Sequence, residues 1–372
     1  MKIIAFYLPQ FHSIPENDKW WGEGFTEWTN LKKAKPLFED HYQPRIPLNN
    51  NYYNLLEDDV MEWQVNLAKK HGVHGFCFYH YWFNGHLLLE KPLKNFLNNN
   101  NIDFPFCMSW ANVEWTQAWV SKEDNVIMKQ EYGDKSNWKE HFDYLLPFFK
   151  DSRYIRVDDK PMFTIYKPDE IKHCKEMMEY WDELAKNNGL KGITFVFQHY
   201  SSLINKNFDP KMFDYGIEYE PFYSFYTYDN KLKKVAINIK HAVEYVARKV
   251  LRKNIISIRS VLRKEDYNKV WDKIIERGKK HRGDLNLFPG AFVDFDNTPR
   301  RANKGIVATG ANPQDFEKYL SRHINNAKNN YKQEYMFLFA WNEWTEGGYL
   351  EPDSKYGYEY LEAIENALKE NS

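Results

Sequence analysis

Long apolar runs are missing from this sequence: no segment approaches the roughly 20 consecutive apolar residues that a membrane-spanning helix needs. Cysteine is scarce, and the three present, Cys77, Cys107 and Cys174, are an odd number without the spacing of a zinc site. The first two lie in apolar runs, as small core residues do. The apolar run within residues 1–9 is too short for a signal sequence and lacks a small-residue cleavage site. We therefore expect a soluble protein of a reducing compartment, the cytoplasm.

Net charge is also nearly absent, because 51 Lys and Arg residues face 52 Asp and Glu residues, a formal charge of −1. A globally basic composition, which is typical of nucleic-acid-binding proteins, is therefore excluded, and we expect no nucleic-acid partner. Aromatic residues are abundant, at 17% with 13 tryptophans. Most of them must fill a core, but many stand beside polar residues, as aromatic side chains do in carbohydrate clefts.

Eight short apolar runs alternate with longer segments of helical periodicity. Several runs lack polar alternation, which is typical of strands buried on both faces of a parallel sheet. This order predicts an α/β fold, a closed (β/α)8 TIM barrel in a single catalytic domain over residues 1–372. An open, doubly wound sheet is the alternative, but no glycine-rich phosphate motif follows the first run. The runs are Ile3–Tyr7, Gly75–Tyr79, Phe104–Ser109, Pro161–Tyr166, Ile193–Gln198, Tyr215–Glu218, Phe288–Val293 and Met336–Ala340.

The stretch Lys231–Arg282, between the sixth and seventh runs, is strongly basic and carries apolar positions at helical spacing. We expect a basic helical insertion within the barrel there, with helices over Ala236–Arg252 and Asp266–Arg282. Two interpretations stay open. The insertion either covers the barrel as a solvated excursion or contacts an anionic inner-membrane surface peripherally.

Polar and aromatic residues accumulate directly after the runs, where a barrel gathers its strand ends on one face. Tryptophan faces stack on sugars, amide and carboxyl groups bind sugar hydroxyls, and histidines donate hydrogen bonds. For each single residue, core packing or an ion pair is the alternative function. The candidate substrate-binding residues are Tyr7, His80, Trp82, Trp110, Asn112, Glu114, Trp115, Tyr166, His199, Glu218, Asp294 and Asp296.

The segment after the last run holds two glutamates three residues apart, Glu343 and Glu346, among further candidates, Trp341, Asn342 and Trp344. Cleavage of a glycosidic bond needs a proton donor and a second carboxyl group, so this pair is the candidate catalytic pair. Nearby tryptophans could desolvate one glutamate and raise its pKa. Alternatively, Asn342 caps a helix whose positive end the two glutamates complement. Spacing alone does not separate the two interpretations.

Two metal sites are alternatives to this interpretation. Asp294 and Asp296 form a D-x-D pair, which holds Mg²⁺ or Mn²⁺ and a diphosphate in many nucleotide-sugar transferases. No N-terminal nucleotide-binding half precedes it, so sugar contacts or ion pairs with Arg300 or Arg301 are favoured. A calcium site is the second alternative, and flanking tryptophans argue against it. Its ligands would be Glu343, Glu346, Glu351 and Asp353. We expect no metal and no cofactor.

Four motifs resemble known carbohydrate-active families over nearly the whole chain. Asn342–Gly347, followed by Glu351-Pro352, resembles the N-E-W-x-E-G…E-P segment of glycoside hydrolase family 99, the endo-α-mannosidases. Ala5–His12, Trp21–Trp28 and Gly75–Trp82 are similar to the related WbsX group, labelled as glycosyltransferases of O-antigen and capsule clusters.

The resemblance implies a (β/α)8 barrel and a retaining mechanism without direct attack by a carboxylate. By motif position, Glu343 would deprotonate the 2-hydroxyl group of the sugar to form a 1,2-anhydro intermediate. Glu346 would protonate the leaving oxygen and later activate water. The leading hypothesis is thus a glycoside hydrolase-like enzyme that cleaves or rearranges a glycosidic bond of a bacterial surface polysaccharide.

Two further functions stay open. One is a glycosyltransferase of O-antigen, lipopolysaccharide or capsule biosynthesis, and the other is a glycan-binding protein without activity. In each case the expected partner is an oligosaccharide or polysaccharide, and a lipid-linked one would suit the basic stretch.

Overall fold

The computed structural model describes residues 1–116, 126–199, 208–227 and 262–372. Nine strands follow one another in a parallel barrel, in the order β12-β10-β9-β8-β4-β2-β1-β15-β13. All eight apolar runs form strands of this barrel, which confirms the predicted α/β barrel and excludes the open sheet. The strands are β1 (Lys2–Tyr7), β2 (Val73–Phe83), β4 (Phe106–Trp110), β8 (Lys160–Ile165), β9 (Thr194–His199), β10 (Tyr215–Glu218), β12 (Leu287–Phe288), β13 (Gly290–Phe292) and β15 (Tyr335–Phe339).

The seventh run closes the barrel in two steps, because Pro289 divides it into β12 and β13. Proline has no N–H group to donate to a neighbouring strand. Before the proline, β12 pairs with β10, and after it β13 pairs with β15. Gly290 passes so close to β10 that a Cβ atom there would lie 1.6 Å from the carbonyl oxygen of Glu218. The sharp change of neighbour therefore requires glycine at this position.

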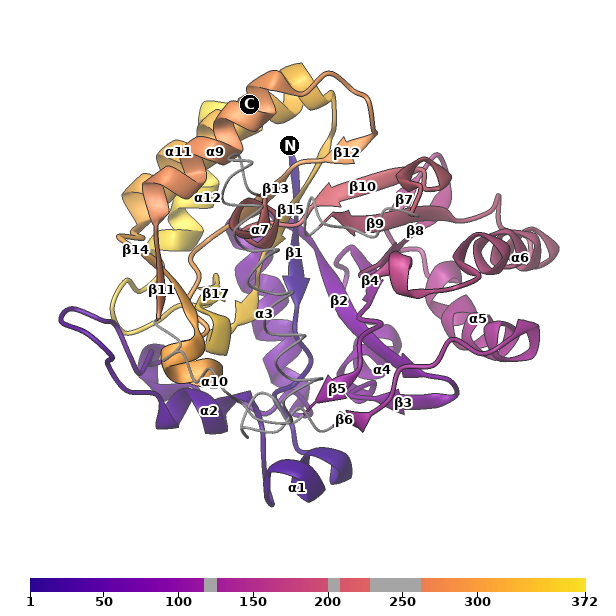
Figure 1. Cartoon of the computed structure of the whole chain (residues 1–372), viewed down its shortest axis with the longest axis horizontal. Helices are drawn as coiled ribbons and strands as arrows, with labels where there is room; N and C mark the ends of the chain where they lie inside the picture. Colours follow the sequence, from indigo (N-terminus) through magenta and orange to yellow (C-terminus); the bar gives the residue numbers. More distant parts are fainter. Residues whose placement is uncertain (117–125, 200–207, 228–261) are drawn as a thin grey trace, which may run out of the picture.

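Helices on the outside of the barrel connect successive strands (Figure 1). Each has one apolar stripe at helical spacing, and that stripe faces the sheet. In α9 (Tyr267–Lys280) the buried residues include Tyr267, Val270, Trp271, Ile274 and Ile275. The other helices of this layer are α3 (Asp58–Lys70), α4 (Lys91–Asn98), α5 (Lys135–Lys150), α6 (Cys174–Asn187), α11 (Pro313–Asn326) and α12 (Glu359–Glu370).

Only the last part of the basic stretch 231–282, residues 262–282, lies within the described residues. The expected helix over 236–252 lies outside them, whereas the expected helix over 266–282 is present as α9. That helix belongs to the layer around the barrel and packs beside α11, with its lysines exposed and Arg277 turned inward to Glu218 and Glu220. It follows strand β11 (Arg263–Asp266), which pairs with β14 (Ile306–Thr309) in a small parallel ribbon.

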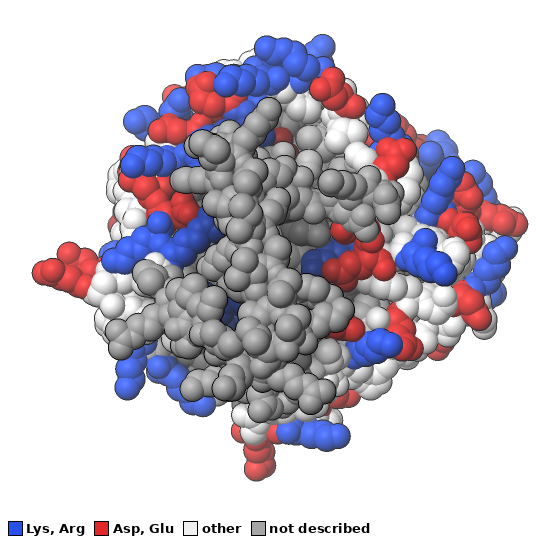
Figure 2. Space-filling view, in the orientation of Figure 1, with Lys and Arg blue, Asp and Glu red and all other residues white. Residues whose placement is uncertain are grey.

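The core is dominated by aromatic rings, with Phe6 and Phe337 among the side chains that contact one another inside the barrel. Cys77 and Cys107 are buried neighbours on β2 and β4, as expected of small core residues, and Cys174 is buried too. Charges of both signs alternate over the described surface in Figure 2. Within the described ranges, none of the helices has both the length and the apolar character that crossing a membrane demands.

Candidate active site

The loop after β15 positions the two candidate glutamates. It forms a small hairpin in which β16 (Asn342–Glu343) pairs with β17 (Gly348–Tyr349) around one 3₁₀ turn, η7 (Trp344–Glu346). Asn342 does not cap this turn: its Oδ1 accepts the backbone N–H of Leu8 at 2.7 Å, and its Nδ2 donates to the Leu8 carbonyl at 3.0 Å. The helix-cap interpretation of the segment is therefore wrong, because Asn342 instead ties the loop to the end of β1.

Gly347 allows the loop to turn back over its neighbour. Its φ angle is +71°, and a Cβ atom there would lie 2.8 Å from the backbone nitrogen of Asp296. That nitrogen donates to the Glu346 carbonyl oxygen at 2.7 Å. The loops after the seventh and eighth strand positions are thus in backbone contact, which brings Arg300 to the glutamates.

One guanidinium group holds three carboxyl groups together at this point. Arg300 Nη1 lies 2.7 Å from Glu346 Oε1, and Nη2 lies 3.3 Å from Glu343 Oε2. Nη2 also lies 2.9 Å from Oε1 of Glu27, which opens α2 (Glu27–Lys33) and accepts a short hydrogen bond from the Thr345 hydroxyl. The two candidate glutamates are therefore neighbours, linked by a shared cation.

The electrostatics of this cluster favour retention of a proton. Burial raises the pKa of Glu343 well above its ordinary range, Arg300 acts in the opposite direction, and the charges of Glu346 and Glu27 add to the rise. Burial alone would lower the pKa of Arg300, but the three carboxyl groups raise it, so this side chain stays charged. Three carboxylates around one cation would leave two negative charges in a buried place. One proton shared by this cluster relieves part of that excess.

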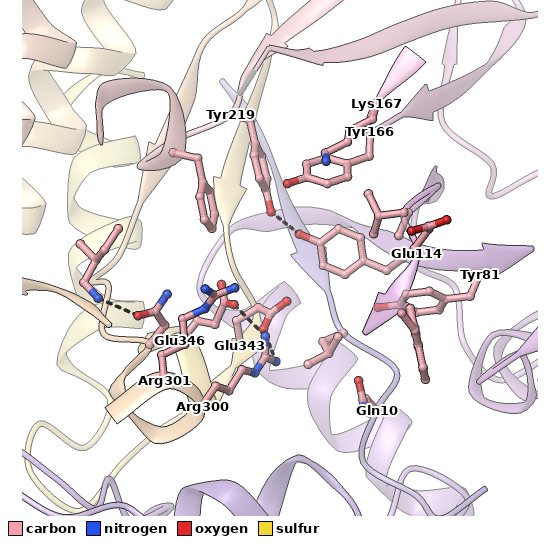
Figure 3. A pocket seen from close by; sticks show the side chains of 18 of the residues that line it. Gln10, Tyr81, Glu114, Tyr166, Lys167, Tyr219, Arg300, Arg301, Glu343 and Glu346 are labelled. Carbon is pink, nitrogen blue, oxygen red and sulfur yellow. Dashed lines mark hydrogen bonds and ion pairs between the residues drawn. The ribbon is translucent and has the colours of Figure 1, made fainter. Parts of the chain in front are cut away.

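The cluster lines one wall of a cavity of about 630 Å³ at the carboxyl ends of the strands. In Figure 3, Glu343, Glu346, Arg300 and Arg301 lie on one side of it, and Tyr219, Tyr166, Lys167 and Glu114 lie on the other. The hydroxyl groups of Tyr79 and Tyr219 are 2.6 Å apart between these walls. Apolar, aromatic and charged side chains thus converge on a space that is large enough for sugar rings.

Five of the predicted site residues line this cavity: Glu114, Trp115, Tyr166, Glu343 and Glu346. Trp115 is half-buried at the rim, in edge contact with Trp20 and Tyr81. Its exposed part is available for a ligand.

Several predicted aromatic and histidine residues belong to the core instead, which corrects those expectations. Tyr7 points away from the cavity, and its hydroxyl donates to Gln64 at 2.7 Å. His80 is buried, with its Nε2 2.8 Å from His141 Nε2, and Trp82 stacks on the same His141 ring. Trp110 is 2% exposed and donates its indole N–H to the Trp82 carbonyl. Alternate residues of a strand face opposite sides, and these side chains face the helices.

Asn112 and His199 lie near strand ends without lining the cavity. Asn112 is fully buried and bridges the backbone of Lys167, accepting its N–H and donating to its carbonyl, each at 2.8 Å. His199 packs edge-on against Tyr223, and burial lowers its pKa to about 4. Both residues support the strand ends on which the lining residues stand.

Glu218 does not line the cavity; it is buried between strand β10 and helix α9. It accepts hydrogen bonds from Arg277 at 3.1 Å and from the Tyr331 hydroxyl at 2.8 Å. It therefore anchors α9 to strand β10.

The D-x-D pair is structural, and its partners differ from those expected. Asp294 pairs with Arg45 at 2.8 Å, not with Arg300 or Arg301. Asp296 lies 2.9 Å from His41 Nε2 and accepts from Gln43 Nε2 at 2.6 Å. One oxygen of each aspartate is held by the loop around residues 41–45, which the sequence gives no reason to place there, and the other accepts from Phe295 or Thr298.

The two tryptophans that flank Glu343 turn away from the cavity and bind a third carboxyl group. Trp341 and Trp344 donate their indole N–H groups to Glu351 at 3.0 and 2.7 Å. Tyr53 and Gln64 donate to the same carboxyl group at 2.9 and 2.6 Å. Burial raises the pKa of Glu351 to about 7, although these four donors lower it. Trp341 and Trp344 are therefore not surfaces on which sugars stack. With Tyr53 and Gln64 they form a buried polar cage around the carboxyl group of Glu351.

That cage also separates the four acids proposed as a calcium site. Glu351 is enclosed by its donors, and Asp353 accepts from Tyr349 at 2.7 Å. In the described part of the chain, no three His, Cys, Asp or Glu side chains come together as metal ligands.

Sequence reasoning missed several lining residues, among them Arg300, Tyr79, Tyr219 and Lys167. It also gave no function to Glu27, the third carboxyl group on Arg300. Tyr79 lies within a strand, where nothing separates a cavity tyrosine from a core one. Glu27 does lie in the quoted segment Trp21–Trp28, so its motif was a usable signal.

The chain is a parallel α/β barrel with a cluster of carboxyl groups in a cavity at its strand ends. Two solved structures share this fold. A glycoside hydrolase-like protein aligns with a TM-score of 0.56 at 11% identity, over 98% of this chain and 93% of that chain. The GH99 endo-alpha-mannosidase from Bacteroides thetaiotaomicron aligns with a TM-score of 0.55 at 13% identity, over 99% and 96%. At these identities the likeness concerns the fold alone.

The chain belongs to the family described as Glycosyltransferase WbsX, whose model matches residues 3–364. Two curated relatives come from strains of Xanthomonas campestris pv. campestris, and both are called "Uncharacterized protein WxcX". They are 33% identical over 374 and 371 residues, which is 98% of this chain and 49% of each relative. The chain thus spans about half the length of the curated relatives that it matches.

Proposed function

We propose that this protein is an enzyme that cleaves or rearranges a glycosidic bond of a bacterial surface polysaccharide. One observation carries the proposal: Glu343 and Glu346 line the same cavity and lie against one guanidinium group, 3.3 and 2.7 Å from its two terminal nitrogens. A proton donor and a second carboxyl group at one place are what this chemistry requires. The family and the glycoside hydrolase-like fold support the same substrate class.

The roles follow from the family 99 resemblance. Glu343, the more deeply buried of the two, acts as the base on the 2-hydroxyl group, for which a raised pKa makes it a stronger acceptor. Glu346 gives its proton to the leaving oxygen and then activates water, so the anomeric configuration is retained. Tyr79, Tyr219 and Glu114 line the space where sugar hydroxyls would be bound.

The test is turnover on a panel of purified bacterial surface polysaccharides, read as new reducing ends, with anomeric configuration followed by NMR. Glu346→Gln and Glu343→Gln should each lower the rate by about 10²–10⁴. Glu16→Gln, a change of equal charge in α1 (Pro15–Trp21) away from the cavity lining, is the control. Full turnover by Glu346→Gln on a substrate that the wild-type protein cleaves would remove the assignment.

A glycosyltransferase is the second candidate, because the family's description names that activity. A transferase should bind a nucleotide-sugar and need a divalent metal, whereas the hydrolase needs neither. Calorimetric titration with UDP-, GDP- and dTDP-sugars, with and without Mn²⁺, separates the two. Metal-dependent nucleotide-sugar binding would favour the transferase.

The location of the protein and a lipid-linked substrate belong to the same proposal. The basic stretch 231–282 would hold the protein at the cytoplasmic surface of the inner membrane, next to a lipid-linked glycan. Cosedimentation with vesicles that contain phosphatidylglycerol, compared with neutral vesicles, measures this contact. Equal binding to both would contradict it.

A further inference from the structure

Two cationic side chains, Arg301 and Lys304, line the same cavity as the glutamate pair. Arg301 ends α10 (Thr298–Arg301), and Lys304 ends η5 (Ala302–Lys304). Neither makes a hydrogen bond or ion pair through its side chain with any other residue that the structure describes. Figure 3 shows Arg301 next to Glu346 and Arg300 at the acidic wall.

The other cations of the cavity are compensated. Arg300 faces three carboxyl groups, and Lys167 Nζ lies 3.0 Å from Glu170 Oε1. Among the described residues that line the cavity, Arg301 and Lys304 are thus the cations whose side chains form no hydrogen bond or ion pair, and both stand on one short segment. A guanidinium or ammonium group that holds no protein partner is available for a ligand.

The segment that carries these cations is held in place on both sides. The backbone N–H of Arg301 donates to the Asn297 carbonyl at 3.0 Å, and Asn297 Oδ1 accepts the N–H of Ile306 at 2.8 Å. The Thr298 hydroxyl donates to Asp296 at 2.6 Å. The side chains of Arg301 and Lys304 are exposed, but their backbone is anchored, so the charges stay at the cavity mouth.

We propose that Arg301 and Lys304 bind an anionic group of the substrate, a carboxylate or a phosphate, while the glycosidic bond lies at Glu343 and Glu346. The inference rests on the proposed function and adds the substrate class: an acidic or phosphorylated glycan. A guanidinium group offers two parallel donors to such an oxyanion, and an ammonium group adds a point charge. These contacts offset the repulsion that the glutamates exert on an anionic ligand.

The experiment compares three sugars that differ in their anionic group: D-glucose, D-glucuronate and D-glucose 1-phosphate. Their dissociation constants are measured by NMR titration of the full chain at low and high salt. We expect at least one anion to bind roughly tenfold more tightly than glucose, as charged hydrogen bonds do. This preference should shrink at high salt. Whether the carboxylate or the phosphate is preferred identifies the source of the charge.

The double variant Arg301→Gln with Lys304→Gln should abolish the preference and leave glucose binding unchanged. Lys280→Gln with Arg282→Gln, an equal change of charge at the end of α9, should keep it. Equal binding of all three sugars, no binding of either anion, or a preference that survives the double variant would overturn the proposal. Glu346→Gln keeps both cations, so loss of turnover and loss of anion preference are separate outcomes.

Discussion

Glu27 and Arg300 are in direct contact across the mouth of the barrel, with Oε1 of the glutamate 2.9 Å from Nη2 of the arginine. Glu27 comes from the loop after the first strand and Arg300 from the loop after the seventh strand position. The other terminal nitrogen of Arg300 holds Glu346. The cation therefore connects three loops of the barrel, and its removal should disturb both charge and geometry.

Arg300→Gln should lower activity and stability together. It leaves three carboxyl groups without their cation, and breaking a buried ion pair on one side costs about 3–5 kcal/mol. Arg300→Lys keeps the positive charge but loses the planar guanidinium group with its paired donors. It should therefore keep part of the stability and little of the activity. Urea unfolding and turnover are the measurements. An Arg300→Gln variant as stable as the wild-type protein would show that the cluster is neutralised in another way.

The rate should rise with pH as Glu343 loses its proton. A base must be ionised when the sugar arrives, and burial raises the pKa of Glu343. The acidic limb of the pH–rate profile should thus lie above that of an ordinary glutamate, which titrates near 4.3. Arg300 lowers this pKa, so Arg300→Lys and Arg300→Gln should move the limb upward in that order. A limb that does not move in either variant would contradict the assignment of Glu343.

Stability should decrease with pH because of Glu351. Its pKa is raised to about 7 in the folded protein, so the folded state holds this proton more tightly than the unfolded chain. The resulting stabilisation is full below about pH 4.3 and is lost as the pH rises to about 7. Relative to Glu351→Gln, the wild-type free energy of unfolding should fall by up to about 1.4 kcal/mol per pH unit in this window. Denaturant unfolding at several pH values measures it, and a constant difference would disprove it.

Tyr79 and Tyr219 should behave as an energetically coupled pair. Their hydroxyl groups are 2.6 Å apart, and both side chains are largely buried. Either single change to phenylalanine leaves one hydroxyl unpaired, at a cost of about 1–3 kcal/mol. The double variant removes both groups and should cost less than the sum of the singles. Additive losses in a double-mutant cycle would show that water satisfies each hydroxyl separately.

Gly290→Ala should prevent proper closure of the barrel. Its Cβ atom would overlap the Glu218 carbonyl oxygen, which belongs to the backbone and cannot move aside. We expect a loss of about 3 kcal/mol or more, at the upper end for overpacking. Gly357→Ala is the control, because it has open space around it and a φ of +55°, so it bears only the strain of a left-handed residue. Equal thermal stability of the two variants would contradict the closure described for β12 and β13.

The strands were predictable because each is an apolar run with a local signal, and burial on both faces makes that signal strong. The division of the seventh run into two strands was not predictable. Pro289 indicates a weakened strand, but it does not indicate that the neighbouring strand changes there. The helix over 266–282 was also predicted, and its place in the barrel layer depends on contacts with α11 that no local pattern carries.

The candidate pair could be found from the sequence because both members stand in one short motif. The residues around it could not, since their partners are distant. Asp294 binds Arg45, 249 positions away, and Gln64 reaches Glu351 across 287 positions. Trp341 and Trp344 show the same limit of sequence analysis. Tryptophans beside glutamates suggest surfaces that stack on sugars, but here both indole N–H groups donate to the buried Glu351 and face inward.

The tie between Asn342 and Leu8 spans 334 positions, and the contact of Thr345 with Glu27 spans 318. During synthesis, the segment that bears the glutamates leaves the ribosome long after its anchors have emerged. A nascent chain that stops before residue 343 holds the first anchors and the barrel's early strands but neither of the two glutamates that we propose as catalytic. On that proposal, truncated translation products should be inert.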